Sequence, residues 1–288
     1  MREIFIRLCV IWKISSTFAL MKKVILITGA SSGFGKASAE YLAQKGYIVY
    51  GTGRNPKEEW TNNVRMLKMD VTDPASVLAA ISLLLSEQSR IDVVVNNAGM
   101  GICGALELAA LDDVRLQMET NFMGTVNVCN AVIPAMRAGG GGRIINISSI
   151  GGVIGIPFQG YYSASKFAVE GYSETLSLEL RPFNIKVCLV EPGDFATNFT
   201  DNRKICLFTE KSEHYAKTFE RTLEIIEKEE RNGGNPLQLA KALNRIIKTK
   251  RPRFRYKIGG FVQVVFAQLK AFVPNRFYQF LLYIYYRL

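Results

Sequence analysis

Short apolar runs alternate with longer amphipathic stretches along most of this 288-residue chain. The apolar runs are the length of buried strands, and they lie at 24–28, 47–54, 64–71, 92–99, 143–149 and 185–193, with a final candidate at 253–258. Helical patterns lie between or after them, at 34–45, 74–88, 111–136, 161–181, 201–230 and 236–249. Strands that alternate with helices predict βαβ units, and therefore a parallel sheet covered by helices on both faces.

The chain has neither an internal repeat nor a linker, so we expect one domain over residues 21–288. Residues 1–20 are apolar but interrupted, and their longest uninterrupted apolar run is Leu8–Trp12. A membrane-spanning helix needs roughly 20 mostly apolar residues. We expect Met21 to be the natural start, because a strand begins directly after it; an interfacial or docking segment is the alternative.

Composition favours a reducing, cytoplasmic compartment and disfavours a metal site. The five cysteines are odd in number and scattered, as free thiols would be. There is a single histidine, so a metal ion would lack its usual imidazole ligands. The predicted protein is cytoplasmic and binds no metal.

The net charge of +11 belongs entirely to the C-terminal segment. From Lys241 onward the chain has eleven Lys or Arg and no Asp or Glu, so the other 25 basic residues equal the 25 acidic ones. This excess predicts either a solvated basic surface or a surface for anionic lipid or an anionic substrate. No nucleic-acid-binding motif accompanies the charge, so we expect no nucleic-acid partner.

The glycine-rich stretch TGASSGFG (28–35) follows the first strand and opens a helix. Gly29, Gly33 and Gly35 allow a tight turn and a close backbone approach, and the N-terminus of the helix offers free N–H groups to a pyrophosphate. The spacing departs from the strict G-x-G-x-x-G form, so the strand–turn–helix context carries part of the prediction.

The second strand predicts NADP(H) rather than NAD(H). A dinucleotide fold that prefers NAD places an acidic residue about 20 positions after the glycine turn, on the ribose 2′-hydroxyl. In this chain Gly53 and Arg54 occupy that region. Arg54 can pair with a 2′-phosphate, with Ser31 or Ser32 hydrogen-bonding beside it.

The stretch QGYYSASKF (159–167) contains a candidate acid–base pair. Tyr162 and Lys166 are four residues apart and share one face of a helix, whereas Tyr161 is turned away. A free tyrosine has a pKa of about 10, and a nearby ammonium favours its phenolate. Tyr162 can then donate a proton to a ketone or remove one from an alcohol. An unremarkable surface pair is the alternative.

Several motifs occur in order and at familiar intervals: TGASSGFG, NNAG (96–99), Asn121, NISS (146–149), YSASK (162–166) and PGDFAT (192–197). Together they resemble the classical short-chain dehydrogenase/reductase family, firmly from residue 21 to about 200. The resemblance implies a doubly wound Rossmann fold with a seven-stranded parallel sheet in the order 3-2-1-4-5-6-7. It also implies nicotinamide-dependent interconversion of alcohols and carbonyls, and EPGDFATNF (191–199) resembles the branch of hydroxysteroid and retinol dehydrogenases.

The resemblance also implies the roles of further residues. Ser149, thirteen residues before Tyr162, would polarise the substrate oxygen. Asn121 would hold a water that links Lys166 to solvent, and Lys166 would reach the nicotinamide ribose. The remaining implied cofactor contacts are Asp70 and Val71 at the adenine, Asn97, Ala98 and Gly99 along the cofactor, and Pro192, Gly193 and Thr197 in the turn that covers the nicotinamide.

The chain from about residue 195 onward is expected to choose and cover the substrate. From Ile258 to Leu288 it has nine Phe or Tyr, three basic residues and no acid. This composition suits a cover over a hydrophobic alcohol or ketone, such as a steroid, a retinoid or a long-chain lipid. Packing on the sheet or on a second subunit, and a peripheral membrane contact, are the alternatives.

The last candidate strand alternates basic and apolar residues. Arg251, Arg253, Arg255 and Lys257 would form one basic face at a sheet edge, where positive charge discourages pairing between edges. We therefore expect a homodimer or a monomer rather than a tetramer.

Taken together, these features predict an NADP(H)-dependent oxidoreductase acting on a hydrophobic substrate. The rival prediction is a non-catalytic NADP-binding regulator or scaffold of the same fold. The complete set of Asn121, Ser149, Tyr162 and Lys166 favours the enzyme, because a protein that only binds the cofactor has no use for all four.

Overall fold

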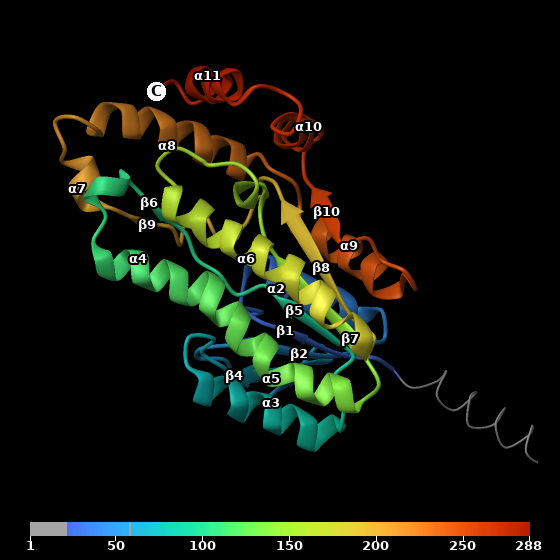
Figure 1. Cartoon of the computed structure of the whole chain (residues 1–288). Coiled ribbons are helices and arrows are strands. Elements are labelled where there is room, and N and C mark those ends of the chain that lie inside the picture. Colours follow the sequence, from blue (N-terminus) through green and yellow to red (C-terminus); the bar gives the residue numbers. More distant parts are fainter. Residues whose placement is uncertain (1–21, 58) are drawn as a thin grey trace, which may run out of the picture.

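The computed structural model describes residues 22–57 and 59–288 of the chain. The expectations for residues 1–20 and for a start at Met21 lie outside this described part. Within it, a central sheet lies between two layers of helices, as the sequence predicts (Figure 1).

The central sheet has eight strands in the order β10-β8-β7-β5-β1-β2-β4-β3. Their bounds are β1 (Val24–Ile27), β2 (Ile48–Gly53), β3 (Trp60–Thr61), β4 (Val64–Lys68), β5 (Val93–Asn96), β7 (Gly142–Ile147), β8 (Ile185–Pro192) and β10 (Arg255–Ile258). Without β3 the strands are all parallel and follow the expected order 3-2-1-4-5-6-7. The unexpected strand β3 pairs antiparallel with β4 at the sheet edge.

Alternate residues of each central strand enter opposite cores. In β1, Val24 and Leu26 pack with the helices of one face, and Ile25 and Ile27 pack with those of the other. These side chains are buried, which is why the strand reads as a continuous apolar run. Helices α3 (Pro74–Gln88), α5 (Gly124–Ala138) and α6 (Gly160–Glu179) cover one face, and α2 (Gly33–Gln44) and α9 (Pro236–Lys248) cover the other.

The helix expected over 111–136 is interrupted. It consists of α4 (Leu111–Met118) and α5, joined by a π-helical turn over Glu119–Met123. Such turns insert one residue into a helix, and they occur frequently at functional sites. A pattern of apolar positions cannot reveal this turn, because the helix axis continues through it.

The segment expected to be helical over 201–230 is helical mainly in its second half, as α8 (Ala216–Arg231). Before it lie a short strand β9 (Lys204–Ile205) and the single turn α7 (Leu207–Glu210). The strand β9 pairs with β6 (Ile102–Cys103), a contact between residues that lie far apart in the sequence.

The basic face expected on the last strand is largely neutralised. The strand β10 does lie beside β8 at the sheet edge, but its Arg255 and Lys257 form ion pairs with glutamates of α6 and β8. Arg251 and Arg253 precede the strand and are exposed. Repulsion between the sheet edges of two subunits would therefore depend on these two arginines. The expected dimer or monomer stays a prediction.

Two helices, α10 (Phe261–Leu269) and α11 (Asn275–Tyr285), follow β10 and lie on the outside of the molecule next to α8 (Figure 1). Neither these nor the other helices of the described residues have the length and hydrophobicity needed to cross a membrane.

The turn between β1 and α2 packs without room for a side chain at Gly35. A Cβ there would lie 2.2 Å from the carbonyl oxygen of Gly29 and 2.7 Å from the amide nitrogen of Asn97. The glycine therefore lets the first turn of α2 lie directly against the end of β1, as close helix–strand packing requires.

We expect Gly35→Ala to lower the free energy of unfolding by about 2 kcal/mol, because the added methyl group must displace the backbone of the turn. Gly171→Ala is the matched control. Gly171 is exposed on α6, where a Cβ would meet nothing within 4 Å among the described residues, so alanine should add up to about 1 kcal/mol. Urea denaturation followed by circular dichroism measures both, and equal stabilities would contradict this packing role.

Candidate active site

A cavity of about 790 Å³ opens at the carboxyl ends of the parallel strands. Ligands bind at this edge of open α/β sheets, where the connecting turns leave a crevice. The predicted site residues that line the cavity are Gly29, Ser31, Ser32, Gly33, Arg54, Asp70, Val71, Asn97, Ala98, Gly99, Ser149, Tyr162, Lys166, Pro192, Gly193 and Thr197. Two predicted residues, Gly35 and Asn121, are packed outside this lining.

The glycine turn has the backbone conformation that its residues permit. Gly29 has φ +65° and Gly33 has φ +52°, values that favour glycine. The first hydrogen bond of α2 runs from the backbone N–H of Lys36 to the carbonyl of Ser32. The N–H groups ahead of Lys36 therefore point out of the helix end toward the cavity, where they can bind an anionic group.

Thr28 joins this turn to the turn after β5. Its hydroxyl oxygen accepts hydrogen bonds from the backbone N–H groups of Asn97 (2.9 Å) and Ala98 (3.0 Å). In return, the Asn97 side chain donates to the carbonyl of Thr28 at 2.9 Å. Sequence reasoning missed Thr28; its position at a strand end directly before the glycine turn was the available signal.

The far end of the cavity carries a positive charge and a fixed carboxylate. Arg54 is exposed directly after β2, and Ser31 lies against the end of that strand, because a Cβ on Gly53 would lie 2.2 Å from its hydroxyl oxygen. The Asp70 carboxylate accepts hydrogen bonds from the backbone N–H (3.0 Å) and the hydroxyl (2.8 Å) of Thr72. This end of the cavity therefore offers a guanidinium to an anionic group.

Ser149, Tyr162 and Lys166 meet at the other end. Ser149 follows the end of β7 by two residues and hydrogen-bonds the phenol of Tyr162, while its oxygen also accepts from the backbone N–H of Gly151 at 3.0 Å. Lys166, one turn after Tyr162 on α6, lies with Nζ 5.9 Å from the centre of the Tyr162 ring. Its ammonium donates to the carbonyl of Ile147 at 2.9 Å.

Burial sets the protonation states of this pair. It raises the pKa of Tyr162 to about 12, although the hydrogen bond from Ser149 works in the opposite direction. It also lowers the pKa of Lys166 to about 8, against the attraction of Glu170. At neutral pH Tyr162 is therefore a neutral phenol, able to donate a proton, beside a lysine that is still mostly charged.

Asn121 lies in the π-helical turn, buried behind the cavity wall. Its amide oxygen accepts from the backbone N–H of Met100 (2.8 Å), and its amide nitrogen donates to the Met100 carbonyl and to the Ser165 hydroxyl, both at 3.0 Å. A Cβ on Gly99 would lie 3.2 Å from the Asn121 amide oxygen and 3.6 Å from Nζ of Lys166. Asn121 is thus close to the lysine, and its predicted water-holding role stays a prediction.

The turn after β8 is fixed by a residue from the C-terminal segment. Gln263 of α10 accepts a hydrogen bond from the backbone N–H of Asp194 at 3.0 Å and donates one to the Asp194 carboxylate. Burial, with Glu230 and Glu229 nearby, raises the pKa of Asp194 to about 7. Neither Gln263 nor Asp194 was singled out from the sequence, since nothing in the pattern pairs positions so far apart.

Tyr161 lies outside the cavity lining. Its phenol donates to the carbonyl of Leu106 at 3.1 Å and so attaches the start of α6 to the segment before α4. Tyr162, which helical spacing selected, is the tyrosine of the pair that lines the cavity.

The chain matches a family model described as short chain dehydrogenase over residues 23–205. It is 58% identical to 3-ketodihydrosphingosine reductase of Bacteroides thetaiotaomicron, in a match that covers 93% of this chain and 99% of that protein. A solved short-chain dehydrogenase from Streptomyces avermitilis is 33% identical with a TM-score of 0.76, covering 86% of this chain and 92% of that one. A structure of ElxO with NADP bound is 26% identical with a TM-score of 0.68, covering 83% and 97%.

The family expected from the motifs is confirmed by these matches, and the cavity lies where that fold binds its ligands. A tyrosine, a serine and a lysine are gathered at one end of that cavity. The chain belongs to the short-chain dehydrogenase family of oxidoreductases.

Proposed function

We propose that the protein reduces the ketone of a long-chain amino ketone to an alcohol, using NADPH, with 3-ketodihydrosphingosine as the type of substrate. The arrangement that carries the proposal is the Tyr162 phenol at the cavity wall, hydrogen-bonded to Ser149 and one helical turn before Lys166. A buried phenol is a proton donor at neutral pH, which suits reduction. The 58% identity to a reductase of that compound supports the choice of substrate.

The chain's own residues handle the oxygen and its proton. The hydroxyls of Ser149 and Tyr162 hydrogen-bond the carbonyl oxygen and polarise it. Tyr162 then donates its proton to that oxygen, and the Lys166 ammonium stabilises the phenolate that remains. When bound, the nicotinamide cofactor supplies the hydride that the carbonyl carbon receives.

The residues at the opposite end of the cavity fit NADP(H). Arg54 lines that end with the Ser31 hydroxyl near it, a combination suited to a 2′-phosphate. The free N–H groups at the start of α2 suit the pyrophosphate, and the positive φ angles of Gly29 and Gly33 bring the backbone close to it. The NADP in the similar ElxO structure supports this assignment.

The substrate end of the cavity favours the long-chain lipid among the hydrophobic substrates considered. Its wall includes Phe199 and Phe266, which suit an alkyl chain, but also the carboxylate of Glu229 and the carboxyl group of Asp194, whose pKa is raised to about 7. 3-Ketodihydrosphingosine has an amine beside its ketone, and a protonated amine pairs with a carboxylate. Steroids and retinoids offer no such cation. The rival function, a cofactor-binding regulator, gives no role to the contact between Ser149 and Tyr162.

We also propose that the C-terminal helices bring the cavity to an anionic lipid surface. Phe261 and Phe272 have 83% and 85% of their surface exposed. Val262 and Phe266 of α10 line the cavity, whereas Phe261 of the same helix faces outward. One helix therefore contributes both to the cavity wall and to the exposed outer face. The basic residues here, without a single acid from Lys241 onward, match anionic headgroups.

Tyr162→Phe should lower kcat for reduction of 3-ketodihydrosphingosine by about 10²- to 10⁴-fold while NADPH still binds, because only the proton donor is removed. Absorbance at 340 nm follows the reaction. Tyr161→Phe is the matched control and should retain normal turnover, since its phenol bonds Leu106 outside the cavity. Unchanged turnover in Tyr162→Phe would refute this mechanism. NADPH binding without turnover of any ketone would favour the regulator.

Arg54→Asp should weaken NADPH binding by about tenfold or more relative to NADH, because the 2′-phosphate loses its cation and gains a repulsive charge. Fluorescence titration with each cofactor measures the ratio. Lys57→Asp makes the same charge change at an exposed position outside the cavity lining and should leave the ratio unchanged. If the two variants had the same ratio of NADPH affinity to NADH affinity, Arg54 would have no role in selecting the cofactor.

The double variant Phe261→Ser and Phe272→Ser should reduce binding to anionic phospholipid vesicles by about tenfold or more, because two exposed aromatic side chains no longer insert. Sedimentation with vesicles of phosphatidylglycerol measures bound protein. Leu207→Ser with Phe208→Ser removes comparable exposed side chains from α7 and serves as control. Wild-type protein that stays in the supernatant at low salt would refute the lipid contact.

A further inference from the structure

Asp194 lines the substrate end of the cavity, close to the residues that would hold the ketone. Strands β7 and β8 pair in parallel, with Ile147 opposite Val190, so their carboxyl ends lie side by side. Ser149 follows the end of β7 by two residues, and Asp194 follows the end of β8 by two residues. Both residues line the same cavity. The fold therefore brings Asp194 to the end of the cavity that contains Ser149 and Tyr162.

A single side chain of α10 orients the carboxyl group of Asp194. The amide nitrogen of Gln263 donates a hydrogen bond to Oδ2 of Asp194, and the amide oxygen accepts one from the backbone N–H of Asp194 at 3.0 Å. The backbone carbonyl of Asp194 accepts a further hydrogen bond from the N–H of Gly234 at 2.9 Å. These bonds fix the main chain and one carboxyl oxygen. The other oxygen, Oδ1, has no hydrogen bond within the described residues.

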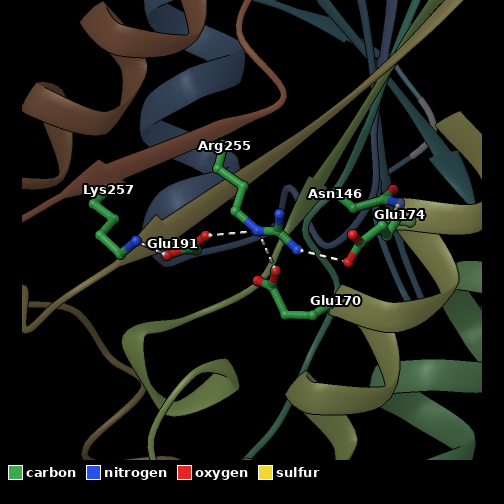
Figure 2. Close-up of polar contacts among 7 residues, drawn as sticks. Asn146, Glu170, Glu174, Glu191, Arg255 and Lys257 are labelled. Carbon is green, nitrogen blue, oxygen red and sulfur yellow. Dashed lines mark hydrogen bonds and ion pairs between the residues drawn. The ribbon is translucent and has the colours of Figure 1, made fainter. Parts of the chain in front are cut away.

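The carboxylates buried elsewhere in the described part of the chain have cationic partners. Between α6, β8 and β10, Glu170 pairs with Arg255 at 3.2 Å, and Glu191 pairs with Lys257 at 3.2 Å (Figure 2). Both glutamates are almost fully removed from water, where an unpaired carboxylate would be costly. These pairs set the standard against which the carboxyl groups of the cavity can be compared.

Three carboxyl groups line the substrate end of the cavity, and their partners differ. Glu230 forms an ion pair with Arg203, so its charge is already balanced. Glu229 accepts a hydrogen bond from the phenol of Tyr285, and Asp194 accepts one from an amide. Neither of these two has an ion pair with a Lys or Arg of the described residues. The cavity therefore offers two carboxyl groups that lack a cation.

Of these two, Asp194 is the one placed beside the reacting groups. It leaves the strand next to the one that ends before Ser149, whereas Glu229 belongs to α8 and its carboxylate is bonded to Tyr285 of α11. In 3-ketodihydrosphingosine the amine is on the carbon directly beside the carbonyl carbon. Only a carboxylate close to the hydroxyls of Ser149 and Tyr162 can therefore reach the amine while they hold the carbonyl oxygen.

We propose that Asp194 selects an amino ketone by pairing its free carboxyl oxygen with the ammonium of the substrate, and that Gln263 is its positioning residue. The inference rests on the proposed function, because it places the amine beside a ketone that Ser149 and Tyr162 hold. It assigns the choice between an amino lipid and a neutral ketone to one carboxyl group. It also makes that choice depend on the C-terminal segment, through α10.

The pKa of Asp194 agrees with a site that lacks its cation. Burial raises this pKa, and the negative charges of Glu230 and Glu229 add to the effect, so that it reaches about 7. Gln263 and Arg203 act in the opposite direction. An ammonium beside the carboxyl group favours its charged form. The substrate would therefore supply the opposite charge that the described residues do not place there.

The test compares two ketones, 3-ketodihydrosphingosine and the same long-chain hydroxyketone without its amino group. The measured quantity is selectivity, the ratio of kcat/KM for the amino ketone to kcat/KM for the neutral ketone. Asp194→Asn keeps the shape of the side chain and removes its charge, so selectivity should fall by about tenfold or more. Gln263→Leu should lower selectivity by about threefold or more, because the carboxyl group loses the hydrogen bond that orients it.

Asp201→Asn is the matched control, since it makes the same chemical change outside the cavity lining. The Asp201 side chain is 61% exposed and pairs with Arg231 at 3.0 Å, so this variant should keep the selectivity of the wild type. Glu229→Gln tests the competing carboxylate of the cavity. It should lower selectivity less than Asp194→Asn does.

Unchanged selectivity in Asp194→Asn would overturn the inference, as would a larger loss in Glu229→Gln or a wild type that does not prefer the amino ketone. An equal loss of kcat/KM for both ketones would also overturn it, because that is the effect of damaged packing. Should Asp194→Asn fail to fold, unchanged selectivity in Gln263→Leu has the same consequence. A wild type that reduces neither ketone refutes the proposed function and the inference with it. A wild type that reduces the amino ketone through Tyr162, with unchanged selectivity in Asp194→Asn, refutes only the role of Asp194.

Discussion

Close backbone contact between the turns after β1 and β5 fixes the cavity on which the rest of the site depends. A Cβ on Gly29 would lie 2.9 Å from Cα of Ala98, and the Thr28 hydroxyl accepts hydrogen bonds from both residues after β5. The parallel register brings these strand ends to the same edge. Because the turns cannot move apart without losing these bonds, the start of α2 remains aimed into the cavity. The anion-binding end is thus built from backbone rather than from flexible side chains.

The reactive end depends on burial instead. Burial raises the pKa of the Tyr162 phenol and lowers the pKa of the Lys166 ammonium. A buried ammonium needs compensation. That of Lys166 donates a hydrogen bond to the carbonyl of Ile147, and Glu170, one helical turn later, acts to raise its pKa. The same carboxylate is tied through Arg255 to the edge strand. Helix α6, which carries Tyr162 and Lys166, is therefore joined to the C-terminal edge strand by this ion pair.

The C-terminal segment contributes to the cavity in two ways. Gln263 fixes the turn that carries Asp194, and aromatic side chains of α10 and of the chain end add to the wall. Other aromatic side chains of the segment remain exposed on its outer face. One stretch of chain thus supplies an apolar wall, a pair of hydrogen bonds to the turn after β8, and an apolar outer surface. The mixture of apolar wall and carboxylates is what distinguishes an amino lipid from a neutral sterol as the proposed ligand.

The sequence by itself determined the alternation of strands and helices, the glycine turn and the spacing of Tyr162 and Lys166, because each depends on neighbours within one βαβ unit or one helical turn. The strand order came from the family resemblance. It also selected Ser149 through the family resemblance. Only the tertiary structure decided what joins distant segments: the π-helical turn at Asn121, the bond from Gln263 to Asp194, and the pairing of Arg255 with Glu170. Local patterns report which face of an element is apolar. They do not report which charges meet across elements, because that depends on how the sheet brings strand ends and helix faces together.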